Sequence, residues 1–222
     1  MKNLFALIAL FCLFASYSQT DSEIDVLTAE ICKTLEENKN TPDSLNVAFT
    51  FQKHFPLFLE KNNIDTEEKY NALTDRIFFR LQKNCNFFVA ILARNNENKS
   101  DWEVLQTAPP SNIQKKDCKK ITYTKNFYYL EHDGKKVHVT IDNGKWIEKF
   151  EDGTYSNLNF KWISDCEFEI EFIESNNNMR KNLSFKGDKY SYVLYESKGN
   201  DLKFYVKTNT PAVQSSWLHA DK

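Results

Sequence analysis

KWIEKFEDGTYSNLNFKWISDCEFEIEF, residues 145–172, contains the clearest two-residue periodicity in the sequence. Its final part, residues 166–172, alternates between apolar side chains and glutamates, which is typical of a strand with one buried face. Upstream, Asp152-Gly153 separates two further alternating runs, and glycine tolerates the positive φ that a tight hairpin turn requires. The stretch therefore predicts an antiparallel meander.

The same pattern extends on both sides of this stretch, over residues 121–208. Turn signals recur at short intervals, at Asp133-Gly134, Asn143-Gly144, Asp152-Gly153, Lys186-Gly187 and Lys198-Gly199. Short runs rich in β-branched and aromatic residues lie between them. Because sequential strands joined by short turns form a meander, we expect residues 121–208 to form an antiparallel β domain. About six to eight strands fit this length, arranged as an open sheet or a partial barrel.

Residues 19–94 show helical spacing instead, and they are predicted to form a helical domain. The first helix is expected over residues 22–38, where apolar side chains recur every three or four positions. The second is expected after Pro42, with a broad apolar face of Leu45, Ala48, Phe49, Phe51 and Phe55. The predicted fold class is therefore α+β, with an N-terminal helical domain followed by the β-meander.

Two segments are expected to lie outside these domains. Residues 95–120 are polar and contain Pro109-Pro110, through which a helix cannot continue, so they are predicted to form a linker. Residues 209–222 are predicted to form a flexible tail, apart from Trp217-Leu218.

The N-terminus has the features of a secretory leader. Lys2 precedes an apolar run at residues 4–15, and Ser16-Tyr17-Ser18 places small residues where signal peptidase requires them. We expect residues 1–18 to be a cleaved signal peptide and the protein to be exported, either periplasmic or secreted. The apolar run is shorter than the roughly 20 residues that a spanning helix needs, and no later run is as long, so no membrane span is expected.

Four cysteines follow the predicted leader, and in an exported protein an even number favours disulfides. Cys32 and Cys85 lie in the predicted helical domain, whereas Cys118 and Cys166 lie near or within the β half. We therefore predict the pairs Cys32 with Cys85 and Cys118 with Cys166. Lysines around Cys118 would also favour a reactive thiolate, but a structural disulfide is the preferred interpretation.

Charge and motifs narrow the possible functions. The chain carries 29 basic and 31 acidic side chains, a net charge of −2, which gives no basic surface for nucleic acid. The four cysteines lack the close spacing of a structural zinc site, and the histidines are scattered. The sequence contains no P-loop, G-x-S-x-G or H-E-x-x-H motif. We therefore expect neither a metal nor another cofactor.

Aromatic residues in the β half are the best candidates for a ligand-binding surface. The candidates are Trp146, Trp162, Tyr190 and Tyr192. Such side chains can line an apolar cavity or form a platform for a sugar, but they also pack well inside sheets. Filling of the core is the preferred interpretation, and Leu158, Phe160 and Trp162 are expected to share the core face of their strand.

A carboxylate-dependent hydrolase is the alternative function. Glu167, Glu169 and Glu171 could supply the acid and base, but an acid with a raised pKa requires burial, and alternation places all three on the polar face. We expect them to pair across strands with lysines such as Lys145 and Lys149.

Two resemblances accompany these patterns. Gly144-Lys145-Trp146 resembles the G-x-W tripeptide that opens the first strand of lipocalins, which implies an eight-stranded barrel. More broadly, Gly144 to Glu148 and Trp162 to Glu167 look like signatures of small exported bacterial proteins with a helical segment and a β-meander. That group has no assigned activity, so the second resemblance implies no chemistry. The function expected from the sequence is a non-enzymatic binding or interaction module for a small apolar ligand, a glycan or a protein partner.

Overall fold

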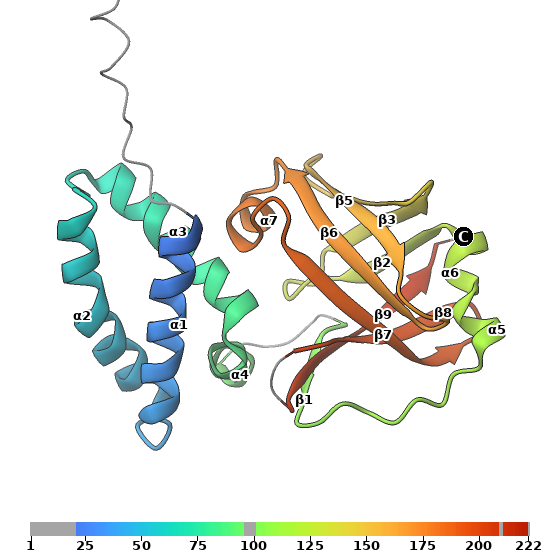
Figure 1. The fold of residues 1–222 in the computed structure, drawn as a ribbon, viewed down its shortest axis with the longest axis horizontal. Helices are drawn as coiled ribbons and strands as arrows, with labels where there is room; N and C mark the ends of the chain where they lie inside the picture. The colour runs from blue at the N-terminus through green and yellow to red at the C-terminus, as the bar shows by residue number, and fades with distance from the viewer. Residues whose placement is uncertain (1–20, 96–100, 209–210, 222) are drawn as a thin grey trace, which may run out of the picture.

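The chain forms a group of helices followed by an antiparallel β-barrel, as the computed structural model in Figure 1 shows. The structure describes residues 21–95, 101–208 and 211–221, so the predicted signal peptide at residues 1–18 lies outside the described residues. The helical domain consists of α1 (Asp21–Glu37), α2 (Asp43–Lys61), α3 (Glu67–Asn84) and α4 (Asn86–Asn95). Shorter helices belong to the barrel half: α5 (Lys115–Cys118), α6 (Lys120–Thr124) and α7 (Asn178–Leu183).

The strands form one antiparallel sheet in the order β1-β9-β2-β3-β4-β5-β6-β7-β8, and β9 also pairs with β8. Their bounds are β1 (Glu103–Leu105), β2 (Asn126–Leu130), β3 (Lys136–Asp142), β4 (Lys145–Phe150), β5 (Tyr155–Trp162), β6 (Glu167–Ser175), β7 (Lys189–Lys198), β8 (Asp201–Val206) and β9 (Val213–Ala220). Because β9 bonds both β8 and β2, strands β2 to β9 close into an eight-stranded barrel, and β1 is an additional strand. The α+β prediction is confirmed, and the sheet is closed rather than open.

The stretch that predicted the meander forms β4, β5 and β6. Gly153 adopts a φ of 81° in the turn between β4 and β5, where its amide donates to the Phe150 carbonyl at 3.0 Å. On β6, the alternating Phe168, Ile170 and Phe172 are buried inside the barrel. The periodicity of this strand therefore predicted its buried face correctly.

Two predicted boundaries are wrong. Most of the expected tail forms β9, whose pairing with β8 and β2 closes the barrel, so Val213–Ala220 is an integral strand. The expected linker contains β1 and α5, and β1 pairs with residues 213–215 of β9. β1 has only three residues and β9 has polar residues at Gln214, Ser215 and Ser216, so their strand structure depends on long-range pairing that sequence patterns do not report.

The cysteines form the disulfides Cys32–Cys85 and Cys118–Cys166, with Cα–Cα distances of 5.5 and 5.3 Å. These are the predicted pairs, and Cys118 is therefore not a reactive thiol. The first bond ties α1 to the end of α3. The second fixes α5 to the turn before β6. For loops of this size, the chain-entropy model gives a stabilisation of about 4 kcal/mol per bond.

The ends of the barrel are covered by the short helices. In Figure 1, α7 lies at the end that faces the helical domain, whereas α5 and α6 lie at the opposite end. Cys118 of α5 and Ile121 of α6 are fully buried within the barrel cluster. Because the interior itself is filled with aromatic and aliphatic side chains, the barrel is a packed core.

Trp146 provides a direct test of this packing. It is 3% exposed, and its ring centroid lies 5.9 Å from that of Phe168. We predict that Trp146→Ala lowers the free energy of unfolding by about 3–5 kcal/mol, because it removes a large side chain from a close-packed core. Urea unfolding followed by circular dichroism measures this change. The control is Tyr155→Ala, at an exposed position on β5, and equal effects of the two substitutions would contradict the core assignment.

Candidate functional site

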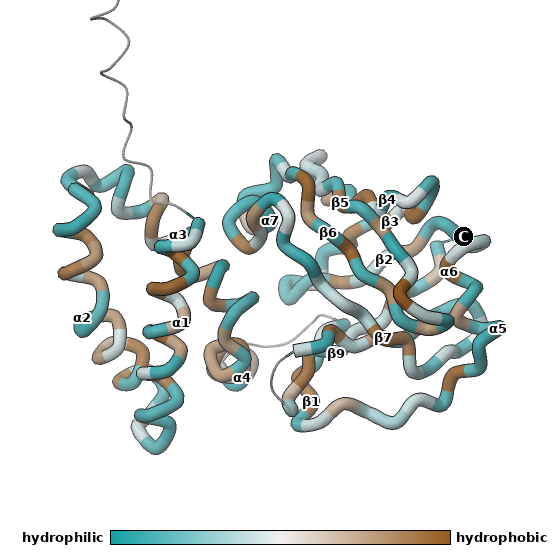
Figure 2. Tube along the Cα trace, viewed as in Figure 1, coloured by the Kyte–Doolittle hydropathy of each residue, from teal (hydrophilic) through white to brown (hydrophobic). Residues whose placement is uncertain are grey.

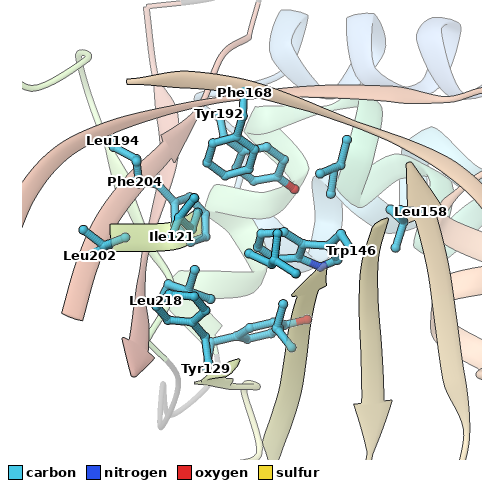
Figure 3. Close-up of a cluster of buried hydrophobic side chains, with 14 of the residues drawn as sticks. Ile121, Tyr129, Trp146, Leu158, Phe168, Tyr192, Leu194, Leu202, Phe204 and Leu218 are labelled. Atoms are coloured by element: carbon cyan, nitrogen blue, oxygen red, sulfur yellow. The ribbon is translucent and has the colours of Figure 1, made fainter. Parts of the chain in front are cut away.

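The barrel interior brings most of the predicted aromatic candidates together. Figure 3 shows Trp146 between the Phe168–Tyr192 pair and Tyr129. The Phe168 and Tyr192 rings stack with centroids 5.1 Å apart and an angle of 9° between their planes. Burial raises the pKa of Tyr192 far above its ordinary value. Trp146 and Tyr192 therefore act as mutual packing partners within the core.

Trp162 and Tyr190 are half-buried. Trp162 packs edge-to-face against Phe160 and Phe168, at centroid distances of 5.5 and 6.0 Å, so it shares the inward face expected for β5. Tyr190 lies at the end of the barrel that faces α3, where its hydroxyl lies 2.6 Å from the Ser184 hydroxyl. These contacts place neither ring on a flat exposed platform.

A buried polar cluster lies inside the barrel below α7. Arg180 of α7 donates to Glu131, to the Tyr129 hydroxyl at 2.6 Å and to Glu148 Oε2 at 3.2 Å. The Tyr129 hydroxyl in turn donates to Glu148 Oε1 at 2.9 Å, and the indole N–H of Trp146 donates to the same oxygen at 3.4 Å. The cluster thus anchors α7 across the end of the barrel.

The charges within this cluster compensate one another. Burial lowers the pKa of Arg180, but the charges of Glu131 and Glu148 outweigh burial and hold that pKa well above its ordinary value. Burial raises the pKa of Tyr129, so this hydroxyl stays protonated. Glu131 and Glu148 are both bonded to the Arg180 guanidinium, which connects α7 to β4 and to the end of β2. We interpret the cluster as structural.

The glutamates of β6 lie on the outside of the barrel and are paired with lysines. Lys207 lies 2.7 Å from Glu167, and Lys189 lies 3.1 Å from Glu169 and 4.0 Å from Glu171. Cross-strand pairing is as expected, but the predicted partners Lys145 and Lys149 are wrong. Those lysines belong to β4, which is separated from β6 by β5.

The helical domain is joined to the barrel by Arg80 of α3. Its side chain is 2% exposed, and its guanidinium bonds both oxygens of Asp25 on α1, at 2.5 and 2.8 Å. The same group bonds Asp188 and donates to the Leu183 carbonyl at 3.0 Å, both in the segment between β6 and β7. It also lies 3.9 Å from the centroid of the Phe185 ring. One arginine therefore connects α1, α3 and the barrel.

Charge at this junction is balanced by several groups. Burial raises the pKa of Asp188, but its hydrogen bonds with Arg80 and Lys83 outweigh this effect and lower the pKa below the ordinary value.

A concavity of about 610 Å³ opens beside these residues. Its acidic lining residues, Asp21, Asp25 and Asp188, are each bonded to an arginine, so the carboxylates already have cationic partners.

The outer face of α2 is different, because it leaves large apolar side chains in water. Leu45, Phe49 and Leu57 are 62%, 55% and 72% exposed. Ala48 and Pro56 are also exposed on this helix. We call these five residues the α2 outer face. Of the exposed large apolar residues in the described chain, six of nine belong to the helical domain, and three of those lie on α2.

Position and shape add to this exposure. In Figure 1, α2 is the helix farthest from the barrel, and Figure 2 shows hydrophobic residues along it. A concavity of about 440 Å³ lies over its first half. Leu45, Ala48 and Phe49 line this hollow with apolar groups, and Asn38 and Thr41 line it with polar groups. An apolar floor with a polar edge is the common anatomy of a protein-binding surface.

The sequence contained a signal for this face that the helical-spacing argument missed. We expected Leu45, Ala48 and Phe49 to share one apolar face with Phe51 and Phe55. In the structure Phe55 is buried and Phe51 partly buried, whereas the other three point to solvent. Because apolar residues occupy both sides of α2, one set cannot enter the core. The set that the core does not cover is left exposed, beside polar residues such as Gln52 and Lys53.

Other kinds of site find no support in the described residues. Among them, no group of three or more histidine, cysteine, aspartate or glutamate side chains is placed to hold a metal ion. A search of the same residues finds no helix with the length and apolar character needed to cross a bilayer.

Comparisons with protein-family models, with curated proteins and with solved structures find no match for this chain. The order of the strands also departs from the lipocalin pattern, because Gly144-Lys145-Trp146 opens β4 after β2 and β3 rather than opening the first strand.

The junction yields a second prediction. We expect Arg80→Ala to lower the free energy of unfolding by about 3–5 kcal/mol, because it leaves Asp25 and Asp188 without their buried cation. Arg76→Ala is the matched control, since Arg76 also lies on α3 and pairs with Asp21, whose side chain is 57% exposed. An exposed pair contributes about 1 kcal/mol or less. Denaturant unfolding of both variants measures the two changes. Similar losses in the free energy of unfolding would show that Arg80 contributes no more to stability than an exposed ion pair does.

Proposed function

We propose that the protein is an exported, non-enzymatic interaction module that binds a partner protein through the α2 outer face. The observation that carries this proposal is the exposure of Leu45, Phe49 and Leu57 on a single helix. Leu45 and Phe49 lie one helical turn apart and so are neighbours on the surface of α2, and exposed apolar patches mark contact surfaces in soluble proteins. Burial of each such side chain against a partner would contribute about 1.5–3 kcal/mol.

The α2 outer face is held rigidly, which favours binding because little entropy is lost when the complex forms. The buried Asn46 of α2 donates to the carbonyls of Leu35 and Asn38, at 2.8 and 3.1 Å, and so fixes α2 to the end of α1. Further along, His54 Nε2 lies 2.8 Å from the Thr34 hydroxyl. The face is thus presented by a helix fixed at two points.

A protein partner fits this surface better than the other ligands considered. A small apolar ligand needs an enclosed cavity, whereas the hollow on α2 is partly open to solvent and the barrel is filled by its own side chains. A sugar was expected on the candidate aromatics, and of these Trp146 and Tyr192 are buried and Trp162 and Tyr190 are half-buried. A hydrolase would need paired carboxylates with one raised pKa, and the glutamates considered for that role are paired with lysines.

Export is part of the proposal. The apolar run at residues 4–15 after Lys2 supports a leader peptide. The two disulfides are compatible with an oxidising compartment.

Photo-cross-linking in the native host tests the binding surface. We predict that a benzophenone amino acid in place of Phe49 yields a discrete adduct with another protein, because this ring would lie within the interface. The same amino acid at Tyr155, an exposed aromatic position on the barrel, is the control and should give no adduct. Adducts are detected by gel shift and identified by mass spectrometry. No adduct at position 49, or the same adduct at both positions, would contradict the proposal, and an adduct of two identical chains would replace the partner with a second copy.

Substitution separates binding from folding. The double variant Leu45→Gln, Phe49→Gln should abolish adduct formation from a benzophenone placed at Leu57. Its free energy of unfolding should stay within about 1 kcal/mol of wild type, because exposed positions usually change stability by about 0.5 kcal/mol each. A loss of several kcal/mol would instead assign both side chains to the core.

A further inference from the structure

The barrel closes at a seam where β9 changes partners. Toward its C-terminal end, β9 pairs with β2 through Tyr128–His219 and Phe127–Ala220. Toward its N-terminal end it pairs with β1 instead, over residues 213–215. The dipeptide Asp101-Trp102, which directly precedes β1, lies beside this change of partners.

The two residues of this dipeptide serve opposite sides of the sheet. Asp101 bonds the edge of β2, since its carboxylate accepts from the Leu130 amide at 2.7 Å and its own amide donates to the Leu130 carbonyl at 3.3 Å. Trp102 packs against the barrel core, with its ring centroid 6.0 Å from Tyr129 and 5.6 Å from Phe204. Asp101 thus fixes the dipeptide to the edge of β2 on the outside of the barrel, while Trp102 fills space in the core on the inside.

His219 of β9 connects Asp101 to the other side of the seam. Its Nε2 lies 3.2 Å from Asp101 Oδ1, and its Nδ1 lies 3.1 Å from Asp201 Oδ2 on β8. An ionised carboxylate only accepts hydrogen bonds, and a neutral imidazole has a single N–H to donate. Both bonds therefore form together only when His219 is a doubly protonated imidazolium. Loss of one proton must break one of the two bonds.

The surroundings of His219 include both aromatic rings and charges. Its ring stacks against Tyr128 of β2 and Trp217 of β9, at centroid distances of 5.0 and 6.2 Å. Lys136 of β3 lies 3.9 Å from the Tyr128 centroid, and Lys203 of β8 lies 5.3 Å from that of Trp217.

Two further pairs complete the neighbourhood. Lys203 is also paired at 2.8 Å with Glu103 of β1. His138 of β3, opposite Tyr128 in the register, is bonded to Asp221 at 2.8 Å. The cations next to His219 thus face its aromatic neighbours, and its two direct partners are carboxylates.

We propose that His219 is a pH-controlled latch, which when protonated bonds Asp101 and Asp201 together across the seam and keeps Trp102 in the barrel, and when deprotonated loses one of these bonds and frees Asp101-Trp102 to move out. Residues 103–105 stay paired with β9. Departure of Trp102 would uncover an apolar opening beside Tyr129 and Phe204. The proposal is independent of the α2 outer face.

The direction of the effect follows from the environment of His219. Burial lowers its pKa, but the hydrogen bonds with Asp201 and Asp101 outweigh burial, and the pKa is raised above the ordinary value of 6.5. A group with a raised pKa in the folded state contributes stability that is complete below its unfolded pKa. That contribution is lost as the pH rises through the folded value. The latch is therefore closed in acid and opens above about pH 6.5.

Fluorine NMR of the full chain labelled with 5-fluorotryptophan tests the latch, with Trp102→Phe used to assign the Trp102 signal. We expect the wild-type Trp102 signal to move toward the solvent-exposed position between about pH 5 and pH 9, with a midpoint above 6.5. The Trp146 signal, from the centre of the core, should stay constant in the same samples. A Trp102 signal that is constant over this range would overturn the proposal.

Matched histidine variants assign the titration. His219→Gln should leave the Trp102 signal independent of pH and at the released position, since glutamine carries no charge. His138→Gln removes the neighbouring histidine of the same face and should preserve the wild-type titration. If the transition persists in His219→Gln, or disappears in His138→Gln, the latch is not His219.

Discussion

Closure of the barrel by β9 is the constraint on which the rest of this structure depends. The strand lies at the end of the chain, yet it must pair with β8 on one side and with β1 and β2 on the other. Once it is in place, the exposed edges of β2 and β8 are satisfied, and the aromatic side chains around Trp146 are enclosed. A closed and filled barrel offers stability but little room for a ligand, so the surfaces available for binding lie on its outside and on the helices.

Arg80 determines how the helical domain is attached to the barrel. Its bonds to Asp25 and Asp188 join α1 and α3 to the segment between β6 and β7. Arg180 anchors the same segment to the barrel interior through Glu131 and Glu148. A buried arginine loses hydration, and only several well-placed acceptors offset that cost, so the joint favours one arrangement. With α1 and α3 fixed in this way, α2 faces away from the barrel, and its outer face remains available.

The sequence predicted those features that depend on local pattern. Alternation in residues 166–172 identified the buried face of β6, and the distribution of cysteines identified both disulfides. It could not identify β9, because Ser215 and Ser216 are polar residues that are buried only through pairing with distant strands. Nor could it assign the two apolar sides of α2, since spacing alone does not show which side meets α1. His219 and Asp101 are 118 residues apart, and only barrel closure brings them together.

A barrel that is filled by its own side chains has no interior space for a ligand. Native mass spectrometry of the protein purified from its own host tests this. We expect the mass of the polypeptide with both disulfides formed and without a bound apolar small molecule. A stoichiometric apolar adduct that survives buffer exchange and is lost on unfolding would contradict it, because such a molecule could be retained only inside the barrel.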